Sequence, residues 1–372
     1  MPKRRVITSV INNYQNDQRV QKVVHSLLKF GFEVEVIATD LRGNPELNFP
    51  YPIHVLPLTS QRGMQMYSEF NRRLFGKLLK MTKKEDILLA NDVDSLIPNY
   101  WISKIKKCPL VLDCHEIYSE MPSLTGRKFK KKIWQKIEAQ LIPKTRHFYT
   151  VSQGCADWFE DAYGNRPEVI RNVPRLEDVV DDTLRLALPE HGKEEKILLY
   201  QGGINVSRGI DKMIQSMPLM DNAQLWIIGD GPKKREYEQL VSELNIGEKV
   251  RFLGSIPPSQ LKLITPKADL GLSLEEDGGI SYRFSLPNKV FDYMHAGIPV
   301  LGTNLPEIKN TIETYKIGRI INNHQPEHLA DIMKLMLAEG KAPYAENLKI
   351  ATSVFNWENE EIKLKKIFEA VR

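Results

Sequence analysis

Short runs of β-branched residues and leucine alternate with longer amphipathic segments along this chain. In the first half, the short runs predict β-strands, and the segments between them have the three- and four-residue apolar spacing of α-helices. The predicted strands are 5–11, 33–38, 53–56, 86–90, 110–114 and 147–151, and the predicted helices are 17–30, 64–81, 94–105, 127–141 and 153–163.

The second half repeats this alternation. A last amphipathic segment, 357–372, predicts a helix after the second series has ended. Within the series, the predicted strands are 196–200, 224–229, 250–253, 270–274, 299–302 and 318–321, and the predicted helices are 207–217, 232–244, 258–264, 289–296, 308–313 and 327–338.

Apolar strands separated by helices indicate parallel sheets that are covered on both faces. Two such series predict an α/β protein with two doubly wound domains, which also fits a chain of 372 residues. The boundary is expected within 175–195, a mixed and acidic stretch. Ligands bind beyond the carboxyl ends of parallel strands, so the loops that follow the strands are where we expect the chemistry.

The composition is that of an ordinary globular protein, with 42% hydrophobic and 27% charged residues. It excludes a disordered chain and a disulfide-rich scaffold. The three cysteines form no CxxC pair, which favours a reducing compartment and no structural zinc site. No apolar run approaches the ~20 residues of a membrane span, and the run after the basic N-terminus is too short for a signal peptide. We therefore expect a cytoplasmic protein.

Basic residues are concentrated in the first part of the chain. Residues 1–150 carry 25 Lys and Arg against 14 Asp and Glu, whereas the remainder carries 27 against 33. In KFKKKIWQK, within the basic stretch 127–136, apolar residues interleave with lysines, as in a helix on an anionic membrane surface. This predicts peripheral attachment at the inner face of the membrane. Solvated helix faces explain the charge equally well, and no nucleic-acid-binding module accompanies it.

The segment SLPNKVFDYMHAGIPV is the most informative in the second half. Ser285 is expected to cap a helix and Pro287 to occupy its first turn. Asn288, Lys289 and Asp292 then share one helical face. That face offers backbone N–H groups and a cation to a diphosphate, with Asp292 accepting from ribose hydroxyls. The alternative is an ordinary capped helix with a solvated Lys–Asp pair.

Two further loops follow predicted strands. In YQGGINVSRG, Gly202 and Gly203 allow a ligand to approach the backbone, and Arg208 can hold phosphate oxygens; a glycine turn with a surface arginine is the alternative. In GDGP, Gly229 and Gly231 begin like a dinucleotide-binding GxGxxG, but lysine occupies the third glycine position, so that motif fails.

In the first half, DCHE places His115 at the end of an apolar strand, where it can donate to a substrate oxygen or act as an acid or base. A histidine satisfied by the backbone is the alternative. The sequence NDVD has the spacing of a DxD metal site. No third ligand is evident, so we favour Asp94 as the N-cap of the following helix and predict no metal site.

These motifs together resemble the group 1 glycosyltransferases (glycosyltransferase family 4). The resemblance rests on SLPNKVFDYMHAGIPV, YQGGINVSRGID, IIGDGP with VRFLG, NDQRVQKVVHSLLKFGFEVEVI and DCHE, which keep the family's order. It implies the GT-B fold, two Rossmann-like domains facing across a cleft. The implied domains are 1–180 for the acceptor and 190–350 for the nucleotide sugar, with a last helix in 351–372 that crosses back to the first domain.

The resemblance also implies a retaining transfer from a nucleotide-diphosphate sugar, without a metal or other cofactor. By position, Arg208, Lys289 and His115 are the implied catalytic residues. The implied nucleotide-sugar-binding residues are Gly202, Gly203, Arg208, Gly229, Gly231, Gly254, Pro287, Asn288, Lys289 and Asp292.

The sequence departs from the family in two places. The family's E-x7-E motif has a glutamate eight residues before the position of Asp292, where this chain has Phe284; three acids, 275–277, lie further upstream. Many members also have arginine at the position of Gly203.

The function that we predict is transfer of a sugar to a glycan or lipid-linked acceptor in surface polysaccharide or glycolipid synthesis. A sugar-nucleotide epimerase of the same fold is one alternative. A non-catalytic partner subunit is another, and nucleic-acid binding is the least favoured. The donor sugar, its base, the acceptor and the oligomeric state are not readable from the sequence.

Overall fold

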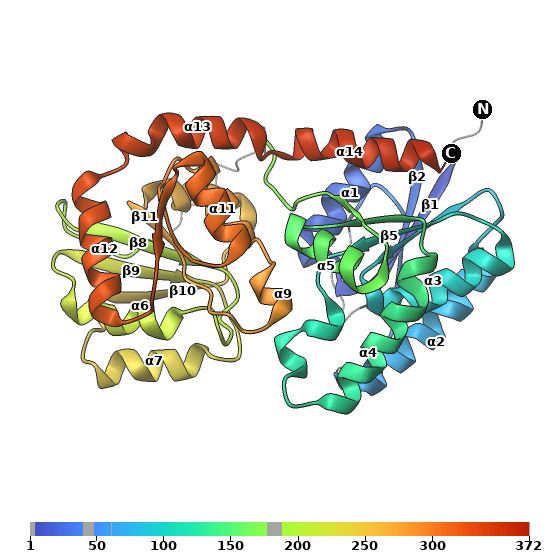
Figure 1. Ribbon diagram of the computed structural model, residues 1–372, viewed down its shortest axis with the longest axis horizontal. Coiled ribbons are helices and arrows are strands. Elements are labelled where there is room, and N and C mark those ends of the chain that lie inside the picture. The colour runs from blue at the N-terminus through green and yellow to red at the C-terminus, as the bar shows by residue number, and fades with distance from the viewer. Residues whose placement is uncertain (1–3, 40–47, 61, 177–187, 372) are drawn as a thin grey trace. The chain divides into compact units, whose positions relative to one another are not determined.

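The computed structural model describes residues 4–39, 48–60, 62–176 and 188–371. The chain divides into two compact units, Met1–Asn172 with Glu360–Arg372, and Val173–Asn359 (Figure 1). Part of the expected boundary segment, 177–187, lies outside the described residues. Among the described helices, none is both long and apolar enough to cross a membrane.

Within the described residues, the first unit contains a parallel sheet in the order β3-β2-β1-β4-β5-β6-β7. The strand positions agree with the predictions, except that the two-residue β7 was not predicted. The strands are β1 Arg5–Asn13, β2 Glu33–Thr39, β3 Ile53–Leu56, β4 Ile87–Asn91, β5 Leu110–Cys114, β6 His147–Thr150 and β7 Glu168–Val169. The helices are α1 Gln18–Lys29, α2 Gly63–Met81, α3 Val93–Lys106, α4 Lys128–Leu141 and α5 Gln153–Tyr163, with the 3-10 helices η1 Tyr14–Asn16, η2 Tyr118–Glu120, η3 Pro122–Leu124 and η4 Ile142–Lys144.

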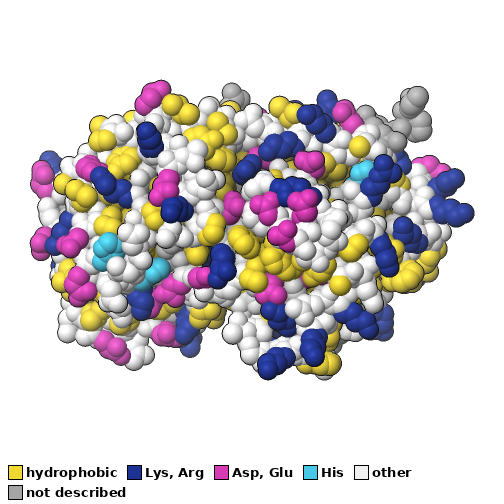
Figure 2. Space-filling model, in the orientation of Figure 1, with side chains coloured by type: hydrophobic (Ala, Val, Ile, Leu, Met, Phe, Trp, Pro, Cys, Tyr) yellow, Lys and Arg dark blue, Asp and Glu magenta, His cyan; other side chains and the backbone are white. Residues whose placement is uncertain are grey.

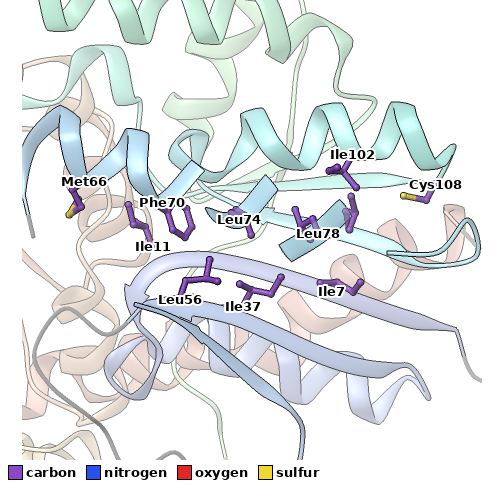
Figure 3. Packing of buried hydrophobic residues seen from close by; sticks show 11 residues of the cluster. Ile7, Ile11, Ile37, Leu56, Met66, Phe70, Leu74, Leu78, Ile102 and Cys108 are labelled. Atoms are coloured by element: carbon purple, nitrogen blue, oxygen red, sulfur yellow. The ribbon is translucent and has the colours of Figure 1, made fainter. Parts of the chain in front are cut away.

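The apolar face of α2 forms much of the core on one side of this sheet. Its residues Phe70, Leu74 and Leu78 recur every four positions, which places them on one helical face. They are completely buried against Ile7 of β1 and Ile37 of β2 (Figure 3). Burying a side chain of this size contributes about 1.5–3 kcal/mol, so this face fixes the helix on the sheet.

The last helix, α14 (Trp357–Ala370), ends in the first unit (Figure 1). Glu361 accepts a hydrogen bond from Ser26 at 2.7 Å and pairs with Lys29 at 2.5 Å, both on α1. Phe368 packs edge-on against Phe32, with 5.9 Å between the ring centroids. Polar and apolar contacts therefore attach the C-terminal residues to α1 and the turn that follows it.

The described strands of the second unit form a parallel sheet in the order β10-β9-β8-β11-β12-β13. Here too the predicted strands are confirmed. They are β8 Lys196–Gln201, β9 Ala223–Ile228, β10 Val250–Gly254, β11 Leu270–Ser273, β12 Val300–Thr303 and β13 Gly318–Ile321. The helices are α6 Ile210–Ser216, α7 Lys234–Glu243, α8 Pro258–Ile264, α9 Ile280–Arg283, α10 Asn288–His295, α11 Pro306–Tyr315, α12 Pro326–Glu339 and α13 Ala345–Val354, with the 3-10 helices η5 Met217–Leu219, η6 Thr265–Lys267 and η7 Ala342–Tyr344.

Two helices of this unit were not predicted. The single turn α9 is too short to show a helical period. In α13 the second half is rich in β-branched residues, and its buried residues are Leu348 and Ala351, so its amphipathic pattern is weak.

The strand order reverses beside the first strand of each sheet: β1 lies between β2 and β4, and β8 lies between β9 and β11. In an open parallel sheet, ligands bind at such a reversal, beyond the carboxyl ends of the strands. The loops after β1 and β4, and after β8 and β11, are therefore the candidate sites.

Candidate functional site

Backbone hydrogen bonds join the loops that follow β8, β9 and β10. The N–H of Gly202 donates to the carbonyl of Ile228 at 2.9 Å, and the N–H of Gly229 donates to the carbonyl of Gly254 at 2.8 Å. Three of the predicted glycines therefore lie in one continuous backbone surface at the carboxyl edge of the second sheet.

Gly229 is required by both space and conformation. Its φ is +143°, and a Cβ atom there would lie 1.9 Å from the carbonyl oxygen of Gly202. We expect Gly229→Ala to lower the free energy of unfolding by about 3 kcal/mol, since both overpacking and a disfavoured φ cost about 1–3 kcal/mol each. Gly247→Ala, where nothing lies within 4 Å, is the matched control. Equal denaturation midpoints for the two variants would contradict this expectation.

The other predicted glycines differ in how closely they are enclosed. A Cβ at Gly231 would lie 2.3 Å from the carbonyl oxygen of Ile204, so that site admits no side chain without movement. A Cβ at Gly203 would lie 2.8 Å from the side-chain amide nitrogen of Asn205, which is the nearest atom. At Gly254 the space is open, but φ is +70°, a conformation that favours glycine.

Two predicted cations converge on one buried carboxylate, Glu275, which follows β11. The ammonium of Lys289 lies 2.5 Å from Glu275 Oε1, and the nearest guanidinium nitrogen of Arg208 lies 3.7 Å from the same oxygen. The second oxygen, Oε2, accepts from the Ser273 hydroxyl at 2.7 Å. Two cations therefore share one carboxylate in this cluster.

Burial and charge set the protonation of this cluster. Burial alone would raise the pKa of Glu275, but the charges of Lys289 and Arg208 hold that pKa below its usual value. Burial lowers the pKa of Lys289, and the charge of Glu275 offsets this only in part. The ammonium lies 4.3 Å from the ring centroid of Tyr200, and the Arg208 guanidinium 4.6 Å from that of Tyr282. These rings restrict the two cations to defined positions.

Helix α10 begins beside this cluster, and its start differs from the prediction. Pro287 occupies the N-cap position, no side chain caps the helix, and the Ser285 hydroxyl donates to the carbonyl of Tyr282 instead. The expected Ser285 cap is therefore wrong, because the bend at Pro287 starts the helix two residues later. The first N–H groups of a helix have no intrahelical partner, so this N-terminus suits an anion.

Asp292 and Asn288 lie on the same helix. The side-chain Nε2 of Gln201 donates to Asp292 Oδ2 at 2.8 Å, and the Thr265 hydroxyl donates to the side-chain Oε1 of Gln201 at 2.9 Å. These two hydrogen bonds hold the Asp292 carboxylate near Gln201, the last residue of β8. Asn288 is exposed at the first position of the helix.

The acids upstream of α10 have separate environments. Glu275 is buried with the two cations, and Asp277 pairs with Arg283 at 2.6 Å. Glu276 is partly exposed, and Phe284 directly follows the short helix α9.

In the first unit, His115 lies between two carboxylates at the ends of β4 and β5. Its Nδ1 is 3.1 Å from Asp92 Oδ2, and its Nε2 is 3.2 Å from Asp113 Oδ2. Burial alone would lower the pKa of His115, but the charges of Asp92 and Asp113 raise it well above its usual value. An imidazolium that can donate from both nitrogens is the form that these neighbours favour.

Asp113 is itself held by a buried arginine. Arg19 of α1 makes hydrogen bonds to both oxygens of Asp113, the shortest at 2.7 Å, and donates to the carbonyl of Ile170 at 3.1 Å. Burial would raise the pKa of Asp113, but Arg19 and His115 lower it to about 2.

The DxD-like segment also differs from the prediction. Asp92, with φ +63°, is the N-cap residue of α3, whereas Asp94 lies in the first turn and accepts from the Tyr118 hydroxyl at 2.7 Å. The expected Asp94 cap is wrong because the helix starts at Val93, so that Asp94 lies inside its first turn. Burial and then the charge of Asp92 raise the pKa of Asp94 to about 8. Among the described residues, no cluster of three His, Cys, Asp or Glu side chains could hold a metal ion.

Comparison with known families agrees with this architecture. The family described as glycosyl transferases group 1 matches residues 187–352, and glycosyltransferase family 4 matches residues 18–177. The chain belongs to the group 1 glycosyltransferases. The two matches together cover both units and include every predicted site residue.

Among curated relatives, this glycosyltransferase is 25% identical over 168 residues to a putative teichuronic acid biosynthesis glycosyltransferase of Bacillus subtilis. That alignment covers 45% of this chain and 41% of the Bacillus protein. The chain spans less than half of the length of that protein and of the other curated relatives that it matches first.

Solved structures confirm the GT-B type of fold. Sucrose-phosphate synthase from Thermosynechococcus elongatus has a TM-score of 0.80, with 16% identity and coverage of 99% of each chain. HepE from Anabaena, solved with UDP and glucose, has a TM-score of 0.74, with 14% identity and coverage of 99% of this chain and 100% of its own.

Sequence reasoning left out the partners that hold the predicted residues of this glycosyltransferase. The sequence shows Glu275 only as one of three acids upstream of α10, and no local pattern connects Arg19 or Asp92 with His115. A usable signal was present, because Glu275 and Asp92 each lie within two residues of a strand's carboxyl end. The network that links Arg19 to Asp113 joins residues 94 positions apart, which no local pattern indicates.

Proposed function

We propose that this chain is a retaining, metal-independent glycosyltransferase that moves a sugar from a nucleotide-diphosphate donor to a glycan or lipid-linked acceptor. The observation that carries the proposal is the pairing of Arg208 and Lys289 with Glu275 beside the uncapped N-terminus of α10. Cations and free N–H groups at the carboxyl edge of a parallel sheet suit a diphosphate.

The chemistry follows from charge. When the bond between sugar and diphosphate breaks, negative charge develops on the leaving phosphate. Arg208, Lys289 and the first N–H groups of α10 stabilise that charge from fixed positions, which is more effective than mobile solvent because no reorganisation is required. The acceptor then attacks on the same face of the sugar from which the diphosphate leaves.

The remaining residues bind the donor. Asp292 accepts hydrogen bonds from the ribose hydroxyls, and Glu276 contacts the transferred sugar, since Glu275 and Asp277 already have cationic partners. His115 is the catalytic residue of the first unit and acts on the transferred sugar and diphosphate. Nucleotide-sugar contacts are proposed for the backbone at Gly202, Gly203, Gly229, Gly231, Gly254, Pro287 and Asn288.

The relatives support the substrate classes. HepE was solved with UDP and glucose, and the Bacillus relative carries a name in teichuronic acid biosynthesis. A uridine diphosphate sugar and a surface-polysaccharide or glycolipid acceptor are therefore the first substrates to test.

Donor binding is tested by thermal shift with UDP, GDP, ADP and CMP and their common sugars, with EDTA present. A ligand at about 100 times its Kd stabilises a protein by about 2.7 kcal/mol. We expect one nucleoside diphosphate to raise the melting temperature by a few degrees, and Asp292→Ala to abolish the shift. Asp331→Ala, an exposed aspartate of α12, is the control and keeps the shift. A flat panel, repeated with Mn²⁺ and still flat, would refute the donor site.

Transfer is separated from epimerisation by incubating the donor without acceptor. An altered sugar nucleotide in that incubation would indicate an epimerase, whereas a product that forms only with acceptor indicates transfer. NMR of the transfer product gives the anomeric configuration of the transferred sugar. The same configuration as in the donor indicates a retaining transfer.

Membrane attachment through α4 is a further part of the proposal. Phe129 is 77% exposed between Lys128 and Lys130, and basic side chains gather over α4 and α2 (Figure 2). We expect the wild-type protein to sediment with anionic but not neutral vesicles, and Phe129→Ser with Lys128→Gln and Lys130→Gln to lose most of this binding. Equal sedimentation with both kinds of vesicle would contradict attachment by charge.

A further inference from the structure

A concave site lies in the first unit, where β5 and β6 begin. Its volume is about 330 Å³, which is within the range of small-ligand pockets. The C-terminal part of α3, the loop to β5, the end of η4 and the start of β6 line it. His115 follows the other end of β5. A strand rises ~3.3 Å per residue, so five residues of β5 place the pocket roughly 15 Å from the proposed chemistry.

Four cations line this pocket without a counter-charge. They are Lys104 of α3, Lys107 at its end, and Lys144 and Arg146 before β6. Of the described residues that line the pocket, none is aspartate or glutamate. Within the described parts of the chain, none of the four forms an ion pair, whereas Lys131 on nearby α4 pairs with Glu120 at 2.7 Å.

The interior of the pocket adds no negative charge. Burial, and then the charge of Asp86, raise the pKa of the Cys108 thiol to about 11, so it remains uncharged at neutral pH. Asp86 does not line the pocket and is paired with Arg5 at 2.6 Å. Burial and then the charge of Arg146 lower the pKa of His147, so its imidazole is neutral. No carboxylate of the described residues lines the pocket to offset the repulsion among the cations, although the Lys104 ammonium lies 5.2 Å from the ring centroid of Tyr100.

Helix geometry accounts for only part of this arrangement. A cation near a helix C-terminus interacts favourably with the free carbonyls there, and Lys104 is in the last turn of α3. Lys144 and Arg146 lie outside α3, 40 and 42 positions after Lys104 in the sequence. The pairing of β5 with β6, in the register Val111 to His147, brings the two groups together.

We propose that this pocket binds a phosphate-bearing anion at a site separate from the donor site of the second unit. The arginine fork can hold two phosphate oxygens, and the three ammonium groups supply further charge-assisted contacts. The ligand is a soluble phosphate compound or a phospholipid headgroup, and both present the same chemistry to these side chains.

The test uses His147 as a reporter inside the pocket. Its C–H proton signal, assigned with His147→Gln, is titrated by NMR at low ionic strength with and without inorganic pyrophosphate. We expect pyrophosphate to raise the measured pKa of His147, since a nearby anion favours the imidazolium. His147 is the first residue of β6, at the opposite end of that strand from the carboxyl edge where the proposed chemistry lies. If the pKa of His147 in the wild-type protein is unchanged at saturating pyrophosphate, the proposal is overturned without any variant.

A charge-matched pair of variants completes the test. The pocket variant carries Gln at Lys104, Lys107, Lys144 and Arg146; the control carries Gln at the exposed Lys193, Lys309, Lys334 and Lys349 of the second unit. We expect the His147 shift to require at least tenfold more pyrophosphate in the pocket variant and to be unchanged in the control. Equal shifts in both would overturn the proposal.

Vesicles identify the source of the phosphate. Both variants also carry Phe129→Ser, Lys128→Gln and Lys130→Gln in this assay, so that α4 does not contribute to sedimentation. If phosphatidylcholine vesicles containing phosphatidylglycerol then sediment the control but not the pocket variant, the ligand is a lipid headgroup. If both variants sediment equally and only the pyrophosphate response is lost, the ligand is soluble.

Discussion

Replacing Arg208 with alanine is expected to lower kcat by about 10²–10³-fold while weakening donor binding much less, because its charge matters most as the diphosphate leaves. The fold should tolerate the change. Glu275 keeps Lys289 at 2.5 Å, so no buried carboxylate loses its only cation. Lys289→Ala is a poorer test, since Glu275 would then retain only a guanidinium 3.7 Å away.

The measurement is kcat and donor affinity for Arg208→Ala beside Arg283→Ala. Arg283 is the matched control, since it pairs with Asp277 and its side chain is 47% exposed. Control turnover near that of the wild type is expected. Full turnover in Arg208→Ala would show that the leaving phosphate does not depend on this guanidinium.

Replacing Arg19 with methionine is expected to lower the free energy of unfolding of the first unit by about 3–5 kcal/mol. The change leaves Asp113 completely buried and without the guanidinium that contacts both of its oxygens. Arg166→Met is the control. Arg166 pairs with Asp157 and Glu160 at the surface, and exposed pairs contribute about 1 kcal/mol or less.

Denaturant unfolding of both variants measures the difference, and the double variant Arg19→Met with Asp113→Leu checks the cause. Removing both charges should recover much of the stability that Arg19→Met loses, because the buried carboxylate, which would keep only His115 as a charged partner, is then absent. If the double variant is as unstable as Arg19→Met, the loss of unfolding free energy comes from packing and not from the buried charge. The double variant should still have low turnover, since His115 has lost the carboxylate beside its Nε2.

The ion pair of Arg19 with Asp113 also predicts how the stability of the protein falls in acid. The pKa of Asp113 is about 2 in the folded state, below its usual value, so its ionised form stabilises folding above the unfolded pKa. That contribution should disappear as the pH falls from about 4 towards 2.

The alternation of strands and helices was readable from the sequence because parallel strands are apolar on both faces. Strands 53–56 and 110–114 were predicted to the residue. The positions of Gly202, Gly229 and Arg208 after strands, and of Lys289 and Asp292 on one helix, were also readable from local spacing. Local spacing failed for β7 and α9, which are too short to show a period, and for the start of α10, which Pro287 decides.

The sequence by itself determined the fold type, the family and the residue types available at each strand end. Only the tertiary structure decided which charges meet: Glu275 with Lys289 and Arg208, Asp113 with Arg19 and His115, and the four cations around the pocket where β5 and β6 begin. Strand order and helix packing set these pairings, and they join residues up to 94 positions apart in the sequence. Hydrophobic periodicity records which face of an element is buried but not which distant side chain shares that face.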